Sequence, residues 1–162
     1  MCVILITSKG TRKEVIAMKI WFDMDGTIAN LYAVDGWLNM LRAFDPTPYK
    51  EAKPLLHMAT FARMLNRLQA KGYEICIISW CSKESTAEYD EAVRVAKLAW
   101  LAKHLPSVHW DVVKIVPYGQ NKWHICKSGI LFDDEERNRN AWEQGKAFTP
   151  ETIFATLSAL TR

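Results

Sequence analysis

The sequence lacks the features that mark several large classes of protein. Its net charge is only +3 over 162 residues, and apart from Lys9, Arg12 and Lys13 its basic residues are scattered, so a nucleic-acid-binding face is not favoured. The apolar run Met1–Ile6 is too short to span a membrane and lacks the basic flank of a targeting signal. Neither repeats nor low-complexity segments occur. We therefore expect one cytoplasmic globular domain without a membrane partner.

Cysteine and histidine motifs for metal binding are also missing. The four cysteines include no CxxC pair, and the four histidines show no ligand spacing, so neither residue type predicts a metal site. Because no disulfide pattern is present, the cysteines are expected to be reduced, as in cytoplasmic proteins. Cys76 lies in an apolar run and is expected to pack as a small hydrophobic residue.

The chain does contain a regular alternation of short apolar runs and helical patterns. Strand-like runs occupy 19–24, 73–78, 111–116, 130–132 and 146–148, and helical patterns occupy 57–70, 84–104, 121–127, 137–144 and the segment from Thr149 to the carboxyl end. Strands that alternate with helices predict a parallel sheet covered on both faces. The predicted fold class is therefore α/β, a Rossmann-like three-layer α/β/α sandwich.

Two segments lie outside this alternation. Residues 1–18 precede the first core strand and are expected to form an amino-terminal extension, either an extra edge strand or an appendage. Residues 30–54 are rich in aromatic residues and proline, which predicts an irregular segment with a short helix near 34–43 that ends at Asp45-Pro46. The remaining chain, within residues 19–162, is expected to form a single domain.

The most informative segment is Phe22–Thr27, which contains two carboxylates two positions apart. Asp23 and Asp25 follow an apolar run and precede Gly26, so both acids are expected at the carboxyl end of a buried strand, where open α/β sheets bind ligands. Two close carboxylates repel each other, and burying them is costly unless a cation or a proton offsets the charge. A divalent metal beside a nucleophilic aspartate is the simplest explanation.

The Asp-x-Asp-Gly pattern at residues 23–26 also has simpler explanations. Asp-x-Asp-Gly also occurs in turns, where Asp and Gly are common because of their backbone preferences. It occurs in calcium loops as well, but such a loop needs a Glu at its twelfth position. Counted from Asp23, that position is Val34, which disfavours a calcium loop.

Other predicted strand ends carry polar groups of a matching kind. Ser79 ends the second strand, Lys122 lies in the loop after the third, and Asp133 and Asp134 follow the fourth. Phosphoryl transfer through an aspartyl-phosphate needs such a set. A carboxylate attacks phosphorus, Mg²⁺ neutralises charge, a hydroxyl and an ammonium bind the phosphoryl oxygens, and a second carboxylate moves protons.

Each of these residues also has a plainer interpretation. Ser79 can be an ordinary hydroxyl at a strand end, and Asp134 can be a helix cap. Lys114 competes with Lys122 as the ammonium group, but Lys114 falls inside a strand pattern and is expected to point to solvent. Lys122 is therefore the favoured candidate.

Taken together, the motifs resemble those of the haloacid dehalogenase (HAD) superfamily of phosphohydrolases over about residues 19–160. The family's DxDGT motif is matched at 23–27, and its strand-ending Ser or Thr is matched at 77–79. Its Lys is matched within 119–122, and its acidic pair after an apolar strand is matched at 131–134. The second acid of the first motif, Asp25, favours phosphate chemistry over carbon–halogen cleavage, because the dehalogenase branch lacks an acid there.

The resemblance implies a role for each acid. Asp23 would be the nucleophile that becomes phosphorylated. Asp25 would protonate the leaving oxygen, then activate the hydrolytic water, and would lend its backbone carbonyl to Mg²⁺. Asp133 would bind the metal with Asp23, and Asp134 would support it.

The resemblance also implies a phosphate-binding set and a cap. Ser79, Lys122 and Thr27 would hold the phosphoryl group. Residues 30–56 would form a small helical cap inserted after the first core strand. A cap this short would leave the pocket partly open, which suits nucleotides or phosphorylated polymer ends better than small sugar phosphates.

The short aromatic cap is most similar to that of the 5′(3′)-deoxyribonucleotidase-like branch, which implies a nucleoside monophosphate substrate. Trp37 or Trp80, or else Phe44 or Tyr49, would then stack on the base. The plainer interpretation is that these aromatic residues pack the cap onto the core. Alternative functions are a phosphatase for polynucleotide ends, which is less favoured, a phosphatase for another small metabolite, and a catalytically silent phosphate-binding domain.

Overall fold

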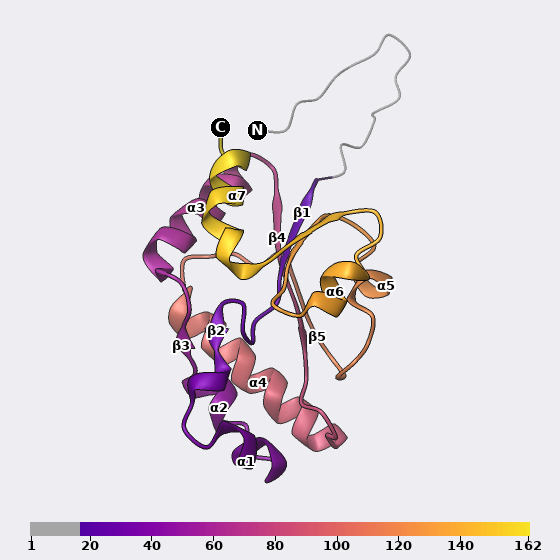
Figure 1. The fold of residues 1–162 in the computed structure, drawn as a ribbon. Helices are drawn as coiled ribbons and strands as arrows, with labels where there is room; N and C mark the ends of the chain where they lie inside the picture. Colours follow the sequence, from indigo (N-terminus) through magenta and orange to yellow (C-terminus); the bar gives the residue numbers. More distant parts are fainter. Residues whose placement is uncertain (1–16) are drawn as a thin grey trace.

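The computed structural model describes residues 17–162, so the predicted extension over residues 1–18 lies outside them except at residues 17 and 18. A five-stranded parallel sheet forms the centre of the molecule, in the order β5-β4-β1-β6-β7 (Figure 1). The strands are β1 (Lys19–Phe22), β4 (Glu74–Trp80), β5 (Val112–Val116), β6 (Ile130–Phe132) and β7 (Lys146–Phe148). All five predicted strands are present in this sheet.

Helices cover both faces of the sheet, as Figure 1 shows. One face packs against α3 (Met58–Ala70), α4 (Ala87–His104) and α7 (Ile153–Leu160), and the other against α5 (Lys122–Cys126) and α6 (Glu136–Asn140). The alternation along β1 explains the division, since Ile20 and Phe22 join the first core cluster and Trp21 joins the second. The fold is therefore the predicted Rossmann-like α/β/α sandwich, with a 3₁₀ turn, Pro150–Thr152, before α7.

The order of the strands places a crevice beside β1. The chain leaves β1 toward β4 on one side and leaves β6 toward β7 on the other, and such a reversal opens a ligand crevice at the carboxyl ends of the strands. Phe22 pairs with Phe132 in the parallel register, and the backbone N–H of Asp23 donates to the carbonyl of Phe132 over 2.9 Å. Asp23 and Asp133 therefore leave neighbouring strands at the same level.

Helix α4 begins at a cap that the sequence supplies. Thr86 Oγ1 accepts a hydrogen bond from the backbone N–H of Tyr89 over 3.2 Å, which satisfies a donor that the first turn would leave free. The helix buries Val93 and Trp100 against the core. Lys97 lies between them on the same face and is also fully buried.

Residues 29–54, which we call the insertion lobe, form a separate small unit beside α4 (Figure 1). The lobe contains β2 (Ala29–Asn30) paired antiparallel with β3 (Lys53–Pro54), a 3₁₀ turn η1 (Leu31–Ala33), α1 (Trp37–Arg42) and α2 (Thr47–Glu51). The predicted short helix near 34–43 is present as α1, whereas α2 and the β2–β3 pair were not predicted. Two hydrogen bonds join the lobe to α4, from Trp100 Nε1 to the carbonyl of Ala52 (2.6 Å) and from the Tyr89 hydroxyl to the carbonyl of Asp45 (2.9 Å).

The structure also bears on the predicted environments of Cys76 and Lys114. Cys76 is fully buried in the core as an uncrosslinked cysteine, as predicted. The prediction that Lys114 points to solvent is wrong, because its Nζ donates to the carbonyl of Ile125 over 3.0 Å and lies 5.7 Å from the Trp21 ring centre. Within residues 17–162, no helix has both the length and the hydropathy needed to cross a bilayer.

Candidate active site

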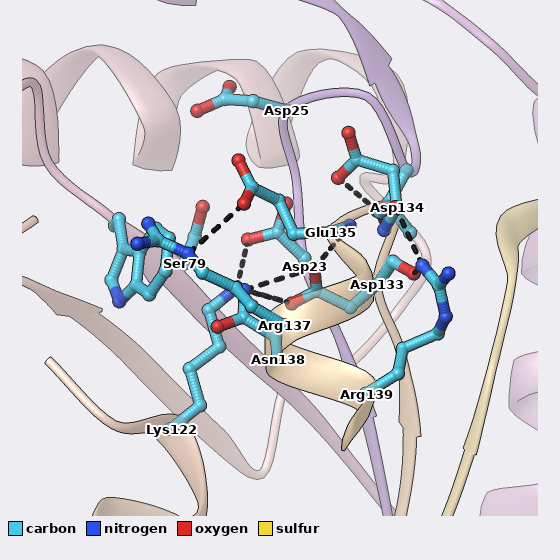
Figure 2. Close-up of polar contacts among 12 residues, drawn as sticks. Asp23, Asp25, Ser79, Lys122, Asp133, Asp134, Glu135, Arg137, Asn138 and Arg139 are labelled. Atoms are coloured by element: carbon cyan, nitrogen blue, oxygen red, sulfur yellow. Dashed lines mark hydrogen bonds and ion pairs between the residues drawn. The ribbon is translucent and has the colours of Figure 1, made fainter. Parts of the chain in front are cut away.

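Three carboxylates meet at the carboxyl ends of β1 and β6. One oxygen from each of Asp23, Asp133 and Asp134 lies within 4.8 Å of the other two, and Figure 2 shows the three side chains converging. Asp133 is fully buried and Asp23 is 6 % exposed. The sequence predicted these acids at strand ends, and the register of β1 and β6 brings them together.

An ammonium group bridges two of the three acids. Lys122, the first residue of α5, donates from Nζ to Asp23 Oδ1 (2.7 Å) and to Asp133 Oδ2 (2.6 Å). Burial acts to lower the pKa of Lys122, but the two carboxylates more than offset it, so its pKa is raised and the group is charged. These two bonds leave one N–H of the ammonium for a third acceptor.

Helix α6 and the residue before it also hold Asp133. Asn138 Nδ2 donates to both oxygens of Asp133 at 3.1 Å, and the backbone N–H of Glu135 donates to Oδ1 at 2.9 Å. Arg139 Nη1 donates to the carbonyls of Asp133 and Asp134. Sequence reasoning missed Asn138 and Arg139, although their place one helical turn after the acidic pair was a usable signal.

Thr27 and Gly26 join the β1 loop to Asp134. Thr27 Oγ1 accepts from the backbone N–H of Asp134 (3.1 Å) and donates to Asp134 Oδ1 (3.4 Å). Thr27 is fully buried, so its predicted contact with a phosphate remains a prediction. At Gly26 the backbone has φ of +75°, and a Cβ would lie 2.3 Å from Asp134 Oδ2, so both conformation and space require glycine there.

The negative charge of the cluster exceeds what the protein offsets. Burial and then the charge of Asp23 raise the pKa of Asp133, and burial together with Asp23 and Asp133 raises the pKa of Asp134 to about 7. Lys122 supplies a single positive charge directly between two of the acids. Carboxylate oxygens are the ligands that hard divalent cations prefer. The donor set therefore fits such a cation.

A second buried lysine lies behind Asp25. Lys97 Nζ donates to Asp25 Oδ2 (2.6 Å), to Ser79 Oγ (2.8 Å) and to the carbonyl of Trp80 (2.7 Å). Burial raises the pKa of Asp25, and the nearby Lys97 ammonium only partly counteracts this. Ser79 is fully buried, so its predicted phosphate contact also remains a prediction.

Sequence reasoning missed Lys97. Its spacing offered a signal, because it lies four residues after Val93 and three before Trp100, on the apolar face of α4.

A cavity of about 490 Å³ opens in front of these groups. Its inner wall consists of polar groups from the sheet edge: Asp23, Asp25, Lys122 and Asp134. Its outer wall includes side chains from the insertion lobe and the β5–α5 loop (Tyr32, Trp37, Arg42, Phe44 and Tyr118) and from the β4–α4 loop (Lys83 and Glu84). Three of the outer-wall residues are large and well exposed, namely Tyr32 (48 %), Phe44 (49 %) and Tyr118 (42 %). The cavity therefore has a cluster of acids and an ammonium on one side, and exposed aromatic rings among a few charged side chains on the other.

The two tryptophans predicted to stack on a base differ in accessibility. Trp80 is only 8 % exposed, and its ring contacts the guanidinium of Arg137 at 4.4 Å and the ammonium of Lys122 at 4.9 Å. Arg137 is itself held by Glu135 (Nε to Oε2, 3.1 Å), as Figure 2 shows. Trp37 is half-buried, and it packs edge-to-face on the exposed ring of Tyr32 with centroids 5.1 Å apart. Trp37 is therefore the more accessible of the two.

Comparison with known proteins supports the fold. No protein-family model matches the sequence, and no curated protein matches it. A chain of the solved Pnkp1/Rnl/Hen1 complex is similar in structure, with a TM-score of 0.53 and 18 % identity over 86 % of this chain and 48 % of that one. This chain thus spans about half the length of that protein.

A D,D-heptose 1,7-bisphosphate phosphatase from Burkholderia thailandensis gives a TM-score of 0.46 and 15 % identity over 77 % of this chain and 71 % of that one.

Proposed function

We propose that this protein is a Mg²⁺-dependent phosphohydrolase that cleaves phosphomonoesters through an aspartyl-phosphate on Asp23. The observation that carries the proposal is the cluster of three acids, Asp23, Asp133 and Asp134, with oxygens within 4.8 Å of one another, bridged by the buried Lys122. The strand-end motifs that resemble the HAD superfamily support it further. The fold shared with a chain of the Pnkp1/Rnl/Hen1 complex is consistent with it.

Asp23, Asp133, Asp134 and the backbone carbonyl of Asp25 would hold the cation. A bound Mg²⁺ would neutralise charge on the phosphoryl oxygens and so lower the repulsion between the substrate and the attacking carboxylate. The raised pKa values of Asp133 and Asp134 support a cation here, because burial and then the neighbouring carboxylates disfavour their charged forms, and a bound cation would relieve both effects.

The chemistry assigned to the side chains has two halves. In the first, an oxygen of Asp23 forms a bond to phosphorus while the ester P–O bond breaks, and Asp25 gives its proton to the departing oxygen. In the second, Asp25 takes a proton from water, the water oxygen bonds to phosphorus, and the bond from phosphorus to Asp23 breaks. Inorganic phosphate leaves and both acids return to their starting states.

Lys122 is the first candidate for binding the phosphoryl group. It lines the cavity, is charged, and has one N–H beyond those that bind Asp23 and Asp133. Ser79 and Thr27 are fully buried, so their hydroxyl groups would act on the phosphate only after a local rearrangement.

The outer wall supports a substrate that carries a ring. Its exposed aromatic side chains offer apolar faces in the same cavity as the acids. Stacking of a base on an aromatic ring contributes about 1–3 kcal/mol per base. Arg42 on the same wall suits an anionic or polar substituent. We therefore assign a nucleoside monophosphate as the substrate class and the insertion lobe as the cap that selects it.

Phosphate release from a panel of esters tests the proposal. The panel contains nucleoside monophosphates, a 3′-phosphorylated oligonucleotide and p-nitrophenyl phosphate, each with Mg²⁺ and with EDTA. We expect Mg²⁺-dependent release that is fastest with a nucleoside monophosphate. Faster release from the oligonucleotide would make the protein a polynucleotide-end phosphatase. No release from any ester, by a folded protein that binds Mg²⁺, would favour a silent phosphate-binding domain.

A further inference from the structure

Lys97 is an unusual residue to find in the interior of this molecule. It lies in the middle of α4, and its side chain is completely buried. Removing an ammonium group from water costs several kcal/mol unless its charge is paired and its N–H groups are bonded. An apolar residue at this position of α4 would extend the face formed by Val93 and Trp100 at no such cost. The lysine therefore needs an explanation beyond packing.

The hydrogen bonds of Lys97 exclude direct contact with a substrate. An ammonium group has three N–H donors, and Lys97 uses all of them, on Asp25 Oδ2, Ser79 Oγ and the carbonyl of Trp80. Lys122 differs, because it bonds two carboxylates and lines the cavity. Lys97 can therefore act on a reaction only through the groups that it holds.

The groups around the Lys97 ammonium, three bonded to it and one packed on it, belong to three separate segments. Asp25 comes from the loop after β1, and its side chain is 17 % exposed where it lines the cavity. Ser79 and Trp80 end β4. The buried ring of Tyr49, from α2 of the insertion lobe, lies 4.9 Å from Nζ and covers the ammonium on that side. Lys97 thus ties Asp25 to the end of β4 and to the lobe.

We propose that Lys97 is a positioning residue, which holds the carboxylate of Asp25 in the orientation needed to transfer a proton to and from the reacting oxygens. This inference rests on the proposed phosphohydrolase function. It assigns no substrate contact to Lys97. It requires that the loss of Lys97 impair proton transfer specifically, and leave the binding of the phosphoryl group largely intact.

Leaving-group dependence distinguishes this role from a structural one. The experiment compares Lys97→Met with the wild type on p-nitrophenyl phosphate, whose leaving group needs little protonation, and on an alkyl phosphomonoester, whose leaving group needs it strongly. We expect kcat on the alkyl ester to fall about 100-fold or more, the lower end of what general acid–base catalysis contributes. On p-nitrophenyl phosphate we expect about a threefold loss or less, with KM unchanged on both esters.

A matched control is available in Lys114→Met. Lys114 is half-buried and hydrogen-bonded to a carbonyl, and it lies outside the site, so the substitution should leave the ratio of the two rates unchanged. Equal losses on both esters in Lys97→Met would overturn the inference while leaving the phosphohydrolase proposal intact. A wild type that hydrolyses neither ester would remove both.

Lys97→Met leaves the Asp25 carboxylate without its partner, and the variant could fail to fold for that reason. A double variant keeps the test decisive in that case. Asp25→Asn keeps an oxygen acceptor for the Lys97 ammonium, and Asp25→Asn/Lys97→Met removes both charges of the pair together. If Lys97 acts through Asp25, the second substitution adds no further loss on the alkyl ester. A further loss of about tenfold or more, which is about 1.4 kcal/mol, would show that Lys97 acts independently of Asp25 and would overturn the inference.

Discussion

The two walls of the cavity are built in opposite ways. Inner-wall groups come from strand ends and from the start of α5, are buried or half-buried, and are held by hydrogen bonds, as the contact of Lys122 with Asp23 shows. Outer-wall groups come from short helices and a loop, and Tyr32 and Phe44 leave about half of their surface exposed. A group held by several bonds has little freedom to move, whereas an exposed ring can be exchanged at small cost. Chemistry and selectivity should therefore be separable by mutation.

The largest effect is expected at Asp23, the proposed nucleophile. Asp23→Asn should lower turnover of every phosphomonoester by about 10⁴-fold or more, the size of loss seen when other enzymes lose a nucleophile. The protein should remain folded, because the amide is isosteric and Lys122 keeps its bond to Asp133. Steady-state kinetics and circular dichroism measure the two effects. Asp35→Asn, at an exposed lobe position, is the control, and retained turnover in Asp23→Asn would contradict a covalent mechanism.

The next effect is on stability, at the bridge between the acids. Lys122→Met should lower the free energy of unfolding by about 3–5 kcal/mol, because it leaves Asp23 and Asp133 buried without their partner. Urea unfolding of this variant and of Lys114→Met, without divalent cations, measures the difference. A loss no larger than that of Lys114→Met would mean that the inner wall is not held by this bridge.

A smaller stabilisation is expected from the cation itself. Mg²⁺ at about 100 times its dissociation constant should stabilise the wild type by about 2.7 kcal/mol, because it binds only the folded cluster. Asp133→Asn should abolish the shift in melting temperature, since Asp133 is a central member of the cluster. Ca²⁺ and a monovalent salt at equal ionic strength are the controls. An undiminished shift in Asp133→Asn would place the cation elsewhere.

The smallest effect is expected on the outer wall. Trp37→Ala should lower kcat/KM for a nucleoside monophosphate about tenfold, within the 1–3 kcal/mol range of base stacking, and leave p-nitrophenyl phosphate turnover unchanged. Asn39→Ala, an exposed neighbour on α1, should change neither rate. Equal losses on both esters would show that Trp37 packs the lobe instead of contacting the base, and the contrast between the walls would fail.

The inner wall was largely predictable because its signals are local. Asp23 and Asp133 each follow a short apolar run, and the pattern of a parallel sheet places such positions at one edge. Lys97 was not recognised, because its contacts depend on how α4 packs against Asp25 and Ser79. These two residues are 72 and 18 positions away from Lys97 in the sequence.

The outer wall was harder to predict for a different reason. Helix α2 has five residues and includes Pro48, so it is too short for a helical period to emerge. The β2–β3 pair has two residues per strand. The guanidinium of Arg137 on α6 packs over the Trp80 ring, and no local sequence pattern predicts this contact. Exposed and irregular segments carry little periodic signal, so the sequence predicts the surroundings of their side chains less accurately than those of the strand ends.

The attachment of the insertion lobe to α4 limits how far the lobe can move away from the cavity. The lobe is tied at two places, through Trp100 to Ala52 and through Tyr89 to Asp45, and Tyr49 between them is almost fully buried. To swing outward, the lobe would have to break both bonds and expose an aromatic ring to water. We therefore expect the entrance to the cavity to keep its width, so that the proposed enzyme would select substrates by size without a slow opening step.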